Sequence, residues 1–144
     1  MSETAHKFDS TILREYDIRG VVGNDLTAAG VEVIGRAFAA LLAERGLPPR
    51  VVVGRDNRPS GADLRDALVR GLTSCGVAVA DLGVVPTPAM YWALHHLDVP
   101  CGIQITGSHN PPEFNGLKLC VEKASLHGDG LQCLYELGAA GKFP

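Results

Sequence analysis

The stretch 103–118 reads Ile-Gln-Ile-Thr-Gly-Ser-His-Asn-Pro-Pro-Glu-Phe-Asn-Gly-Leu-Lys, in which a polar loop follows an apolar run. The apolar run ends at Ile105, and two successive prolines then fix φ and disfavour helical or sheet pairing. The Asn-Gly pair at 115–116 predicts a turn before the next strand begins at Leu117. The stretch therefore places Ser108 on a stiff loop after a strand, which is where α/β sheets usually bind ligands.

Strand patterns alternate with helical patterns along the rest of the chain. Short β-branched or apolar runs predict strands over residues 16–22, 51–53, 77–82, 101–105 and 117–121. Helical spacing of apolar residues predicts helices between them, with expected N-caps at Thr27, Ser60, Thr87 and Asp129. Ser60 with Asp63 resembles a capping box, and Pro88 would occupy the first helical position. The alternation predicts an α/β fold: a three-layer α/β/α domain with a mixed, mostly parallel sheet.

Composition narrows the class of protein. The 144 residues suit one domain, and 46% hydrophobic with 20% charged residues lies in the globular range. A net charge of -3 argues against a nucleic-acid binder. No segment approaches the roughly 20 apolar residues that span a bilayer, and residues 1–10 carry no apolar run typical of a signal peptide. We therefore expect a soluble cytoplasmic chain that binds neither nucleic acid nor membrane.

The four cysteines, Cys75, Cys101, Cys120 and Cys133, form no C-x-x-C pair. Their spacing indicates neither a zinc site nor a redox motif. We expect four small buried hydrophobic residues in a reducing compartment.

Ser108 has two interpretations from the residues alone. A serine hydroxyl is a weak nucleophile unless a neighbouring group activates it. Serine, asparagine, proline and glycine also form turns, so an ordinary solvent-facing serine fits the composition equally well.

Four motifs, in the same order, resemble those of the α-D-phosphohexomutases, and they span about residues 12–123. They are Thr106-Gly107-Ser108-His109-Asn110-Pro111 with Asn115-Gly116-Leu117-Lys118, Tyr16-Asp17-Ile18-Arg19-Gly20, Gly54-Arg55-Asp56 with Arg58 and Ser60, and Val85-Pro86-Thr87-Pro88. The segments 16–20 and 112–116 look like the bacterial phosphomannomutase/phosphoglucomutase branch rather than the phosphoglucosamine mutases. The resemblance identifies the chain as the phosphoserine domain of such an enzyme.

The resemblance implies a role for each matching residue. Ser108 would carry a phosphoryl group and exchange it with mannose or glucose 1-phosphate or 6-phosphate through a bound 1,6-bisphosphate. Arg19 and Lys118 would stabilise charge along the transfer path, and Lys118 could also move a proton. His109 would bond a phosphate oxygen or shuttle a proton. Tyr16 would orient Arg19 or the sugar, with a core tyrosine as the alternative.

The resemblance also implies Mg²⁺, held here only by a phosphate oxygen on Ser108, because the family's D-G-D-x-D-R loop is absent. The remaining ligands would belong to later domains of a four-domain enzyme, of which residues 1–144 form the first. The isolated chain would then be inactive as a mutase.

The partners implied are a phosphorylated hexose and the missing domains. A second copy of the chain would be a further partner, because helix faces that would pack on the missing domains are left uncovered. The alternatives are a phosphoglucosamine mutase domain and a non-enzymatic phosphosugar-binding or interaction module.

Four further features have mainly structural interpretations. The Arg55, Asp56 and Arg58 cluster favours an ion-paired strand end over a bridge to the serine loop. Asn110 is expected to bond the loop backbone. Trp92 is expected in the core or at a domain interface. The pair His95-His96 is expected at a helix end, where a cationic imidazole suits the dipole.

Overall fold

The computed structural model describes residues 8–144. The expectation of a cytoplasmic protein rested partly on residues 1–10, most of which lie outside the described part. Among residues 8–144, no helix has the length and apolar character needed to cross a membrane.

One mixed sheet runs through the described part of the chain, in the order β1-β5-β4-β2-β3. The short strand β6 pairs with the C-terminal end of β5. The strands are β1 (Ile18–Val21), β2 (Arg50–Arg55), β3 (Ala78–Val84), β4 (Cys101–Ile105), β5 (Phe114–Val121) and β6 (Ala124–Ser125). Strand β2 pairs in parallel with both β3 and β4, whereas β5 runs antiparallel to β1, β4 and β6. The predicted mixed α/β fold is confirmed, and antiparallel pairs take a larger share of the sheet than expected.

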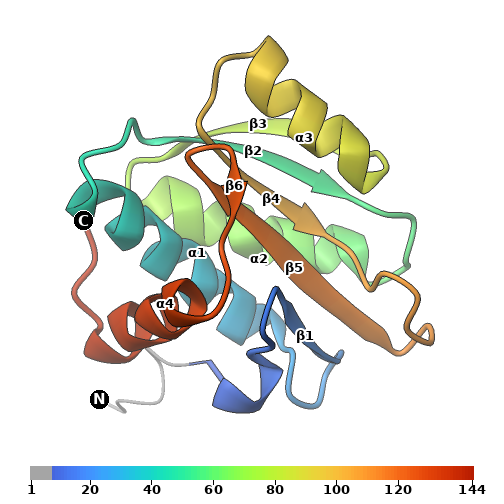
Figure 1. The fold of residues 1–144 in the computed structure, drawn as a ribbon. Coiled ribbons are helices and arrows are strands. Elements are labelled where there is room, and N and C mark those ends of the chain that lie inside the picture. The colour runs from blue at the N-terminus through green and yellow to red at the C-terminus, as the bar shows by residue number, and fades with distance from the viewer. Residues whose placement is uncertain (1–7) are drawn as a thin grey trace.

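Helices cover both faces of the sheet, as predicted. They are η2 (Ser10–Ile12), α1 (Ala28–Glu44), α2 (Gly61–Ser74), α3 (Thr87–His96) and α4 (Asp129–Ala140). Figure 1 shows α3 on the opposite side of the sheet from α1 and α2. Two separate cores follow from this arrangement. The larger core joins α1, α2 and α4 to the sheet, and the smaller core joins α3 to the other face.

Strand β2 explains why the central sheet positions are so apolar. Val51 and Val53 pack in the larger core and Val52 packs in the smaller one. All three side chains are buried because helices cover both faces of the strand. The continuous β-branched run at 51–53 is therefore a correct signature of a strand in the middle of a three-layer fold.

One of the four expected helix caps is confirmed. The Thr27 hydroxyl accepts a hydrogen bond of 3.0 Å from the Gly30 N–H at the start of α1. Ser60 precedes α2 but makes no cap hydrogen bond, because its hydroxyl accepts from the Asn115 side chain at 2.9 Å. A contact made across 55 residues thus replaces the predicted capping box.

The other two caps were misplaced by one residue. Pro86 and Gly128 are the N-caps of α3 and α4, so Thr87 and Asp129 are the first helical residues. Pro88 is consequently the second residue of α3, where a missing N–H still costs no helical hydrogen bond. Asp129 remains favourably placed, since a carboxylate in the first turn suits the helix dipole.

The predicted turn at 115–116 is wrong. Both residues lie inside β5, where Asn115 faces Gly20 and Gly116 faces Arg19 on β1. Gly116 is needed there because a Cβ atom would overlap the Ile18 carbonyl oxygen. The glycine therefore permits a close approach of two strands rather than a reversal of the chain.

The structure corrects two expectations about burial. Cys101 and Cys120 are buried as predicted, and burial raises the pKa of both thiols, but Cys75 and Cys133 are partly exposed. Of the two placements expected for Trp92, the core is wrong and a domain interface stays a prediction: the side chain is 62% exposed and stacks on His96 at the end of α3, with ring centroids 4.3 Å apart.

Candidate active site

A groove of about 470 Å³ opens beyond the carboxyl ends of β2 and β4. Residues from the segments 56–59, 86–87 and 106–112 line it, and Ser108 is among them. Strands β2, β3 and β4 are parallel, so the loops that follow them meet at one edge of the sheet. This is the edge at which open α/β sheets bind ligands, as the sequence predicted for the serine loop.

Ser108 has a backbone conformation that is unusual for serine. Its φ is 53°, in the left-handed region that L-residues with a Cβ atom rarely adopt. Its N–H donates to the Thr106 hydroxyl at 3.1 Å, so Thr106, rather than the expected Asn110, supplies the side-chain bond inside the loop. Strained residues of this kind persist where surrounding contacts hold them and are concentrated at functional sites.

Asp56 lies beside the base of the serine loop and anchors it to the end of β2. Its Oδ2 accepts from the Thr106 hydroxyl at 2.9 Å and from the Gly107 N–H at 3.2 Å. Its Oδ1 accepts from the Arg58 N–H at 3.1 Å. The carboxylate therefore holds the two residues that immediately precede Ser108.

Arg58 contacts the same loop from the other direction. Its guanidinium donates to four backbone carbonyls, those of Ser108, Asn110, Pro111 and Phe114, at 2.7 to 3.1 Å. The sequence analysis favoured an ion-paired strand end for this cluster over a bridge to the serine loop. The ion pairs are present, with Arg58 Nε 3.4 Å from Asp56 and Arg55 Nη1 4.0 Å from Asp81 on the neighbouring strand. The bridge to the serine loop is present as well, because Asp56 and Arg58 both bond that loop.

A second cluster joins β1 to β5 through Asp17, which the sequence analysis assigned no role. The Asp17 carboxylate is 2.6 Å from the Arg19 guanidinium and 3.8 Å from the Lys118 ammonium. Asp17 is buried, whereas about 30% of each cationic side chain is exposed, at 29% and 32%. The carboxylate thus positions two cations whose charged ends remain accessible to a ligand.

Sheet register brings this cluster to the same side of the fold as the serine loop. Arg19 is paired with Gly116, and the Gly116 carbonyl accepts from the Thr106 N–H at 2.9 Å. Arg19 and Thr106 therefore lie on opposite sides of Gly116, and Thr106 is two residues before Ser108. No hydrogen bond within residues 8–144 joins the Arg19 or Lys118 side chain directly to Ser108.

The remaining two predicted site residues are on the surface. Tyr16 is 68% exposed, which excludes the alternative of a core tyrosine, and its ring lies near His127 with centroids 5.8 Å apart. His109 is exposed and follows Ser108 in the loop. Within residues 8–144, no hydrogen bond joins Tyr16 to Arg19 or the His109 side chain to Ser108.

The described residues do not fit a complete magnesium site. No group of three or more Asp, Glu, His or Cys side chains within 8–144 is arranged to hold a metal ion. Asp56, the carboxylate nearest the serine loop, is already used by Thr106, Gly107 and Arg58. Mg²⁺ is usually held by one or two carboxylates together with phosphate oxygens and waters, and the carboxylate beside the serine loop is already bonded.

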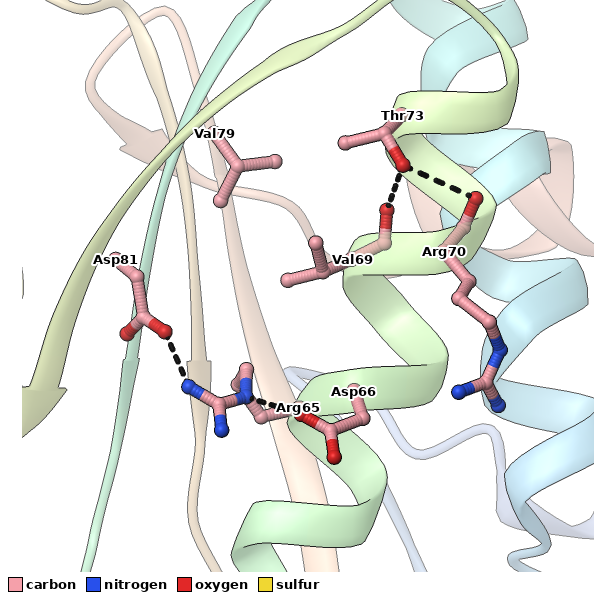
Figure 2. Close-up of a pocket in the computed structure, with 7 residues that line it drawn as sticks. All are labelled: Arg65, Asp66, Val69, Arg70, Thr73, Val79 and Asp81. Atoms are coloured by element: carbon pink, nitrogen blue, oxygen red, sulfur yellow. Dashed lines mark hydrogen bonds and ion pairs between the residues drawn. The ribbon is translucent and has the colours of Figure 1, made fainter.

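A second groove, of about 500 Å³, lies between α2 and the edge strand β3 (Figure 2). Arg65 bridges Asp66 and Asp81. The Thr73 hydroxyl donates to the Val69 carbonyl at 2.8 Å, and Arg70 donates to Glu32 at 3.2 Å. The groove beside Ser108 is the better candidate because it lies at the carboxyl ends of parallel strands.

The ion pair in Figure 2 predicts an acid-sensitive contribution to stability. Burial opposes ionisation of Asp81, but hydrogen bonds from the Gly83 N–H and from Arg65 outweigh it and lower the pKa of the carboxyl. A depressed pKa stabilises the folded state above the pKa of the unfolded state, and this is lost as pH falls through the folded pKa. Unfolding by urea between about pH 6 and pH 3 should therefore be less pH-dependent in Asp81→Asn than in the wild type.

The matched control for this prediction is Asp66→Asn, which removes a carboxylate from the same groove but leaves the bond between Arg65 and Asp81. This control should retain the pH dependence of the wild type. Equal pH dependence in Asp81→Asn and the wild type would contradict the prediction.

Comparison with known proteins gives the family. The model of the "phosphoglucomutase/phosphomannomutase, alpha/beta/alpha domain I" matches residues 10–132. A phosphomannomutase/phosphoglucomutase of Pseudomonas aeruginosa is 47% identical over 127 residues, which are 88% of this chain and 27% of the relative. A phosphoglucomutase of Neisseria gonorrhoeae is 45% identical over 121 residues, which are 84% of this chain and 26% of the relative.

A solved structure agrees with these relatives. The crystal structure of a phosphoglucomutase/phosphomannomutase family protein from Burkholderia thailandensis superposes with a TM-score of 0.83 at 40% identity, over 99% of this chain and 31% of that one. The chain thus spans less than a third of the length of these relatives. The α/β/α fold, the family model and these similarities together place the chain in the phosphoglucomutase/phosphomannomutase family, as its domain I.

Proposed function

We propose that the chain is the phosphoryl-carrying domain of a phosphohexomutase and that Ser108 is the carrier. The observation that carries this proposal is the strained Ser108, whose backbone N–H and carbonyl are both bonded, in the lining of the groove and within the residues that match the family model. The substrate class is a hexose phosphate, with mannose and glucose phosphates favoured by the names of the relatives.

The proposed reaction moves one phosphoryl group in each direction. The bond between phosphorus and the Ser108 oxygen breaks while a bond forms from phosphorus to a sugar hydroxyl oxygen, and the hydroxyl proton passes to a base. Lys118 and His109 are the candidate bases. The bisphosphorylated sugar then returns its other phosphoryl group to Ser108. The protein is left phosphorylated and the sugar phosphate isomerised.

Charge supports an anionic ligand at this edge of the sheet. A phosphoserine carries about -1.5 to -2 at neutral pH, so transfer to a sugar phosphate brings like charges together. Arg19 and Lys118 provide accessible cations on β1 and β5. The groove also includes Thr87, the first residue of α3, and helix N-termini favour negative charge. Within this chain, magnesium would be held only by one phosphate oxygen on Ser108.

The test is phosphoryl uptake from glucose 1,6-bisphosphate. We expect this chain to gain one phosphoryl group, measured by intact mass, and to release an equal amount of hexose monophosphate. We also expect no useful repeated conversion of mannose 1-phosphate to the 6-phosphate. The relatives are more than three times longer, and this chain alone does not fix both ends of the sugar. Uptake at a residue other than Ser108, or turnover at a rate normal for a mutase, would contradict the proposal.

A further inference from the structure

The groups that fix Ser108 come from a segment about 50 residues earlier in the chain. The Ser108 N–H is bonded to Thr106, whose hydroxyl donates to Asp56, and the Ser108 carbonyl accepts from Arg58 at 3.1 Å. Both peptide groups that flank the Ser108 Cα atom are thereby fixed by residues between β2 and α2. The left-handed φ of 53° is therefore held by contacts from outside the loop in addition to the loop's own bonds.

The guanidinium of Arg58 is bonded mainly to other groups of the protein. A guanidinium carries five N–H donors. Nη1 donates to the Pro111 and Phe114 carbonyls, and Nη2 donates to the Ser108 and Asn110 carbonyls. Nε lies 3.4 Å from Asp56. The guanidinium thus makes four hydrogen bonds to carbonyls and one ion pair with Asp56, so its contacts are made to the protein although it lines the groove.

We propose that Arg58 is a positioning residue for phosphoryl transfer at Ser108, which rests on the function proposed above. It acts by holding the serine loop in the reactive conformation through four backbone carbonyl groups. The effect of Arg58 therefore falls on the rate of transfer from bound donor and not on the affinity for the donor.

Gly107 provides independent structural support for this role. A Cβ atom at position 107 would overlap the Arg58 guanidinium, so the side chain occupies the space that the glycine leaves free. Gly107→Ala would displace the guanidinium while leaving its charge in the protein. A variant of this kind separates the placement of Arg58 from its charge.

The first measurement is hydrogen exchange of the loop in the unphosphorylated chain. In Arg58→Met we expect faster exchange of the Gly107, Ser108 and Asn110 amides, which are bonded within the loop or to Asp56. The Thr106 amide, which pairs with β5, should keep its protection. Arg70→Met is the matched control, because Arg70 lies in the groove of Figure 2 and bonds Glu32 instead. It should leave all four amides unchanged.

The second measurement is the rate of Ser108 phosphorylation by glucose 1,6-bisphosphate. We expect Arg58→Met and Gly107→Ala to lower the rate at saturating donor by about 100-fold, as misplacement of a reacting group by about 1 Å can do, with no change in the half-saturating concentration. Arg58→Lys should not restore the rate, because one ammonium cannot span four carbonyls. Added guanidinium below denaturing concentrations should partly restore Arg58→Met, and ammonium should not.

Three outcomes would overturn the proposal. They are unchanged loop exchange in Arg58→Met, a raised half-saturating concentration at an unchanged maximal rate, and full activity of Arg58→Lys. The middle outcome would make Arg58 a donor-binding residue. A wild-type chain that takes up no phosphoryl group would contradict the proposed function instead, and the exchange measurement would still decide whether Arg58 fixes the loop.

Discussion

Ser108→Ala is expected to abolish phosphoryl uptake from glucose 1,6-bisphosphate and to lower mutase turnover of the longer enzyme by roughly 10³-fold or more. The physical reason is that the alanine methyl group has no oxygen to which phosphorus can bond. The other hydroxyls that line the groove within residues 8–144 are those of Thr87, at the start of α3, and Thr106. The Thr106 hydroxyl is committed to Asp56. Intact mass and fragment mass spectrometry of the treated variant measure the loss.

A second variant separates the lost hydroxyl from a damaged loop. Ser108→Gly also lacks the nucleophile but relieves the left-handed strain, so its free energy of unfolding should exceed that of Ser108→Ala by about 1 kcal/mol. Both variants should fail to take up phosphoryl. Ser74→Ala, which changes a remote hydroxyl on α2, should behave as the wild type. Phosphorylation of either Ser108 variant to the wild-type extent would assign the carrier to another residue.

Local patterns were sufficient for the fold class and for the position of the serine loop. A β-branched run such as 51–53 is buried on both faces only in a central strand, and paired prolines stop any element that reaches them. The turn expected at 115–116 shows where such patterns fail. An Asn-Gly pair favours a reversal, but it also suits a strand where two backbones approach closely, and only the partner strand decides between these.

The contacts that hold the candidate site depend on residues far apart in sequence. Arg58 and Asp56 bond a loop about 50 positions away, and their neighbour Arg55 bonds none of it. The charged residues at the end of this strand look alike in the sequence, so nothing there shows which of Arg55, Asp56 and Arg58 bonds the serine loop. Asp17 was missed for the same reason, because its second cation, Lys118, is brought to it by strand pairing. The order of the motifs was the only sequence feature that linked these segments.

Lys118→Met is expected to slow phosphoryl transfer at Ser108 by about 10²–10³-fold, the effect typical of removing one group that stabilises charge in a transition state. The phosphoryl group must pass between two oxygens beside a second anionic phosphate, and each accessible cation along that path lowers the barrier. The folded state should be affected much less. The pair between Lys118 and Asp17 is 3.8 Å long and its lysine is one-third exposed, so its loss should cost at most about 1 kcal/mol.

The matched control is Lys123→Met, which removes a lysine of similar exposure from the turn between β5 and β6, where it pairs with Asp98 at 3.2 Å. Rates at saturating glucose 1,6-bisphosphate and urea unfolding would be measured on both variants. Loss of rate in Lys118→Met alone, with similar stability of the two proteins, would assign the effect to charge placed beside the serine loop. Equal rates in the two variants would show that the cation needed for transfer lies elsewhere, and Arg19, held by the same carboxylate, would be the next residue to replace.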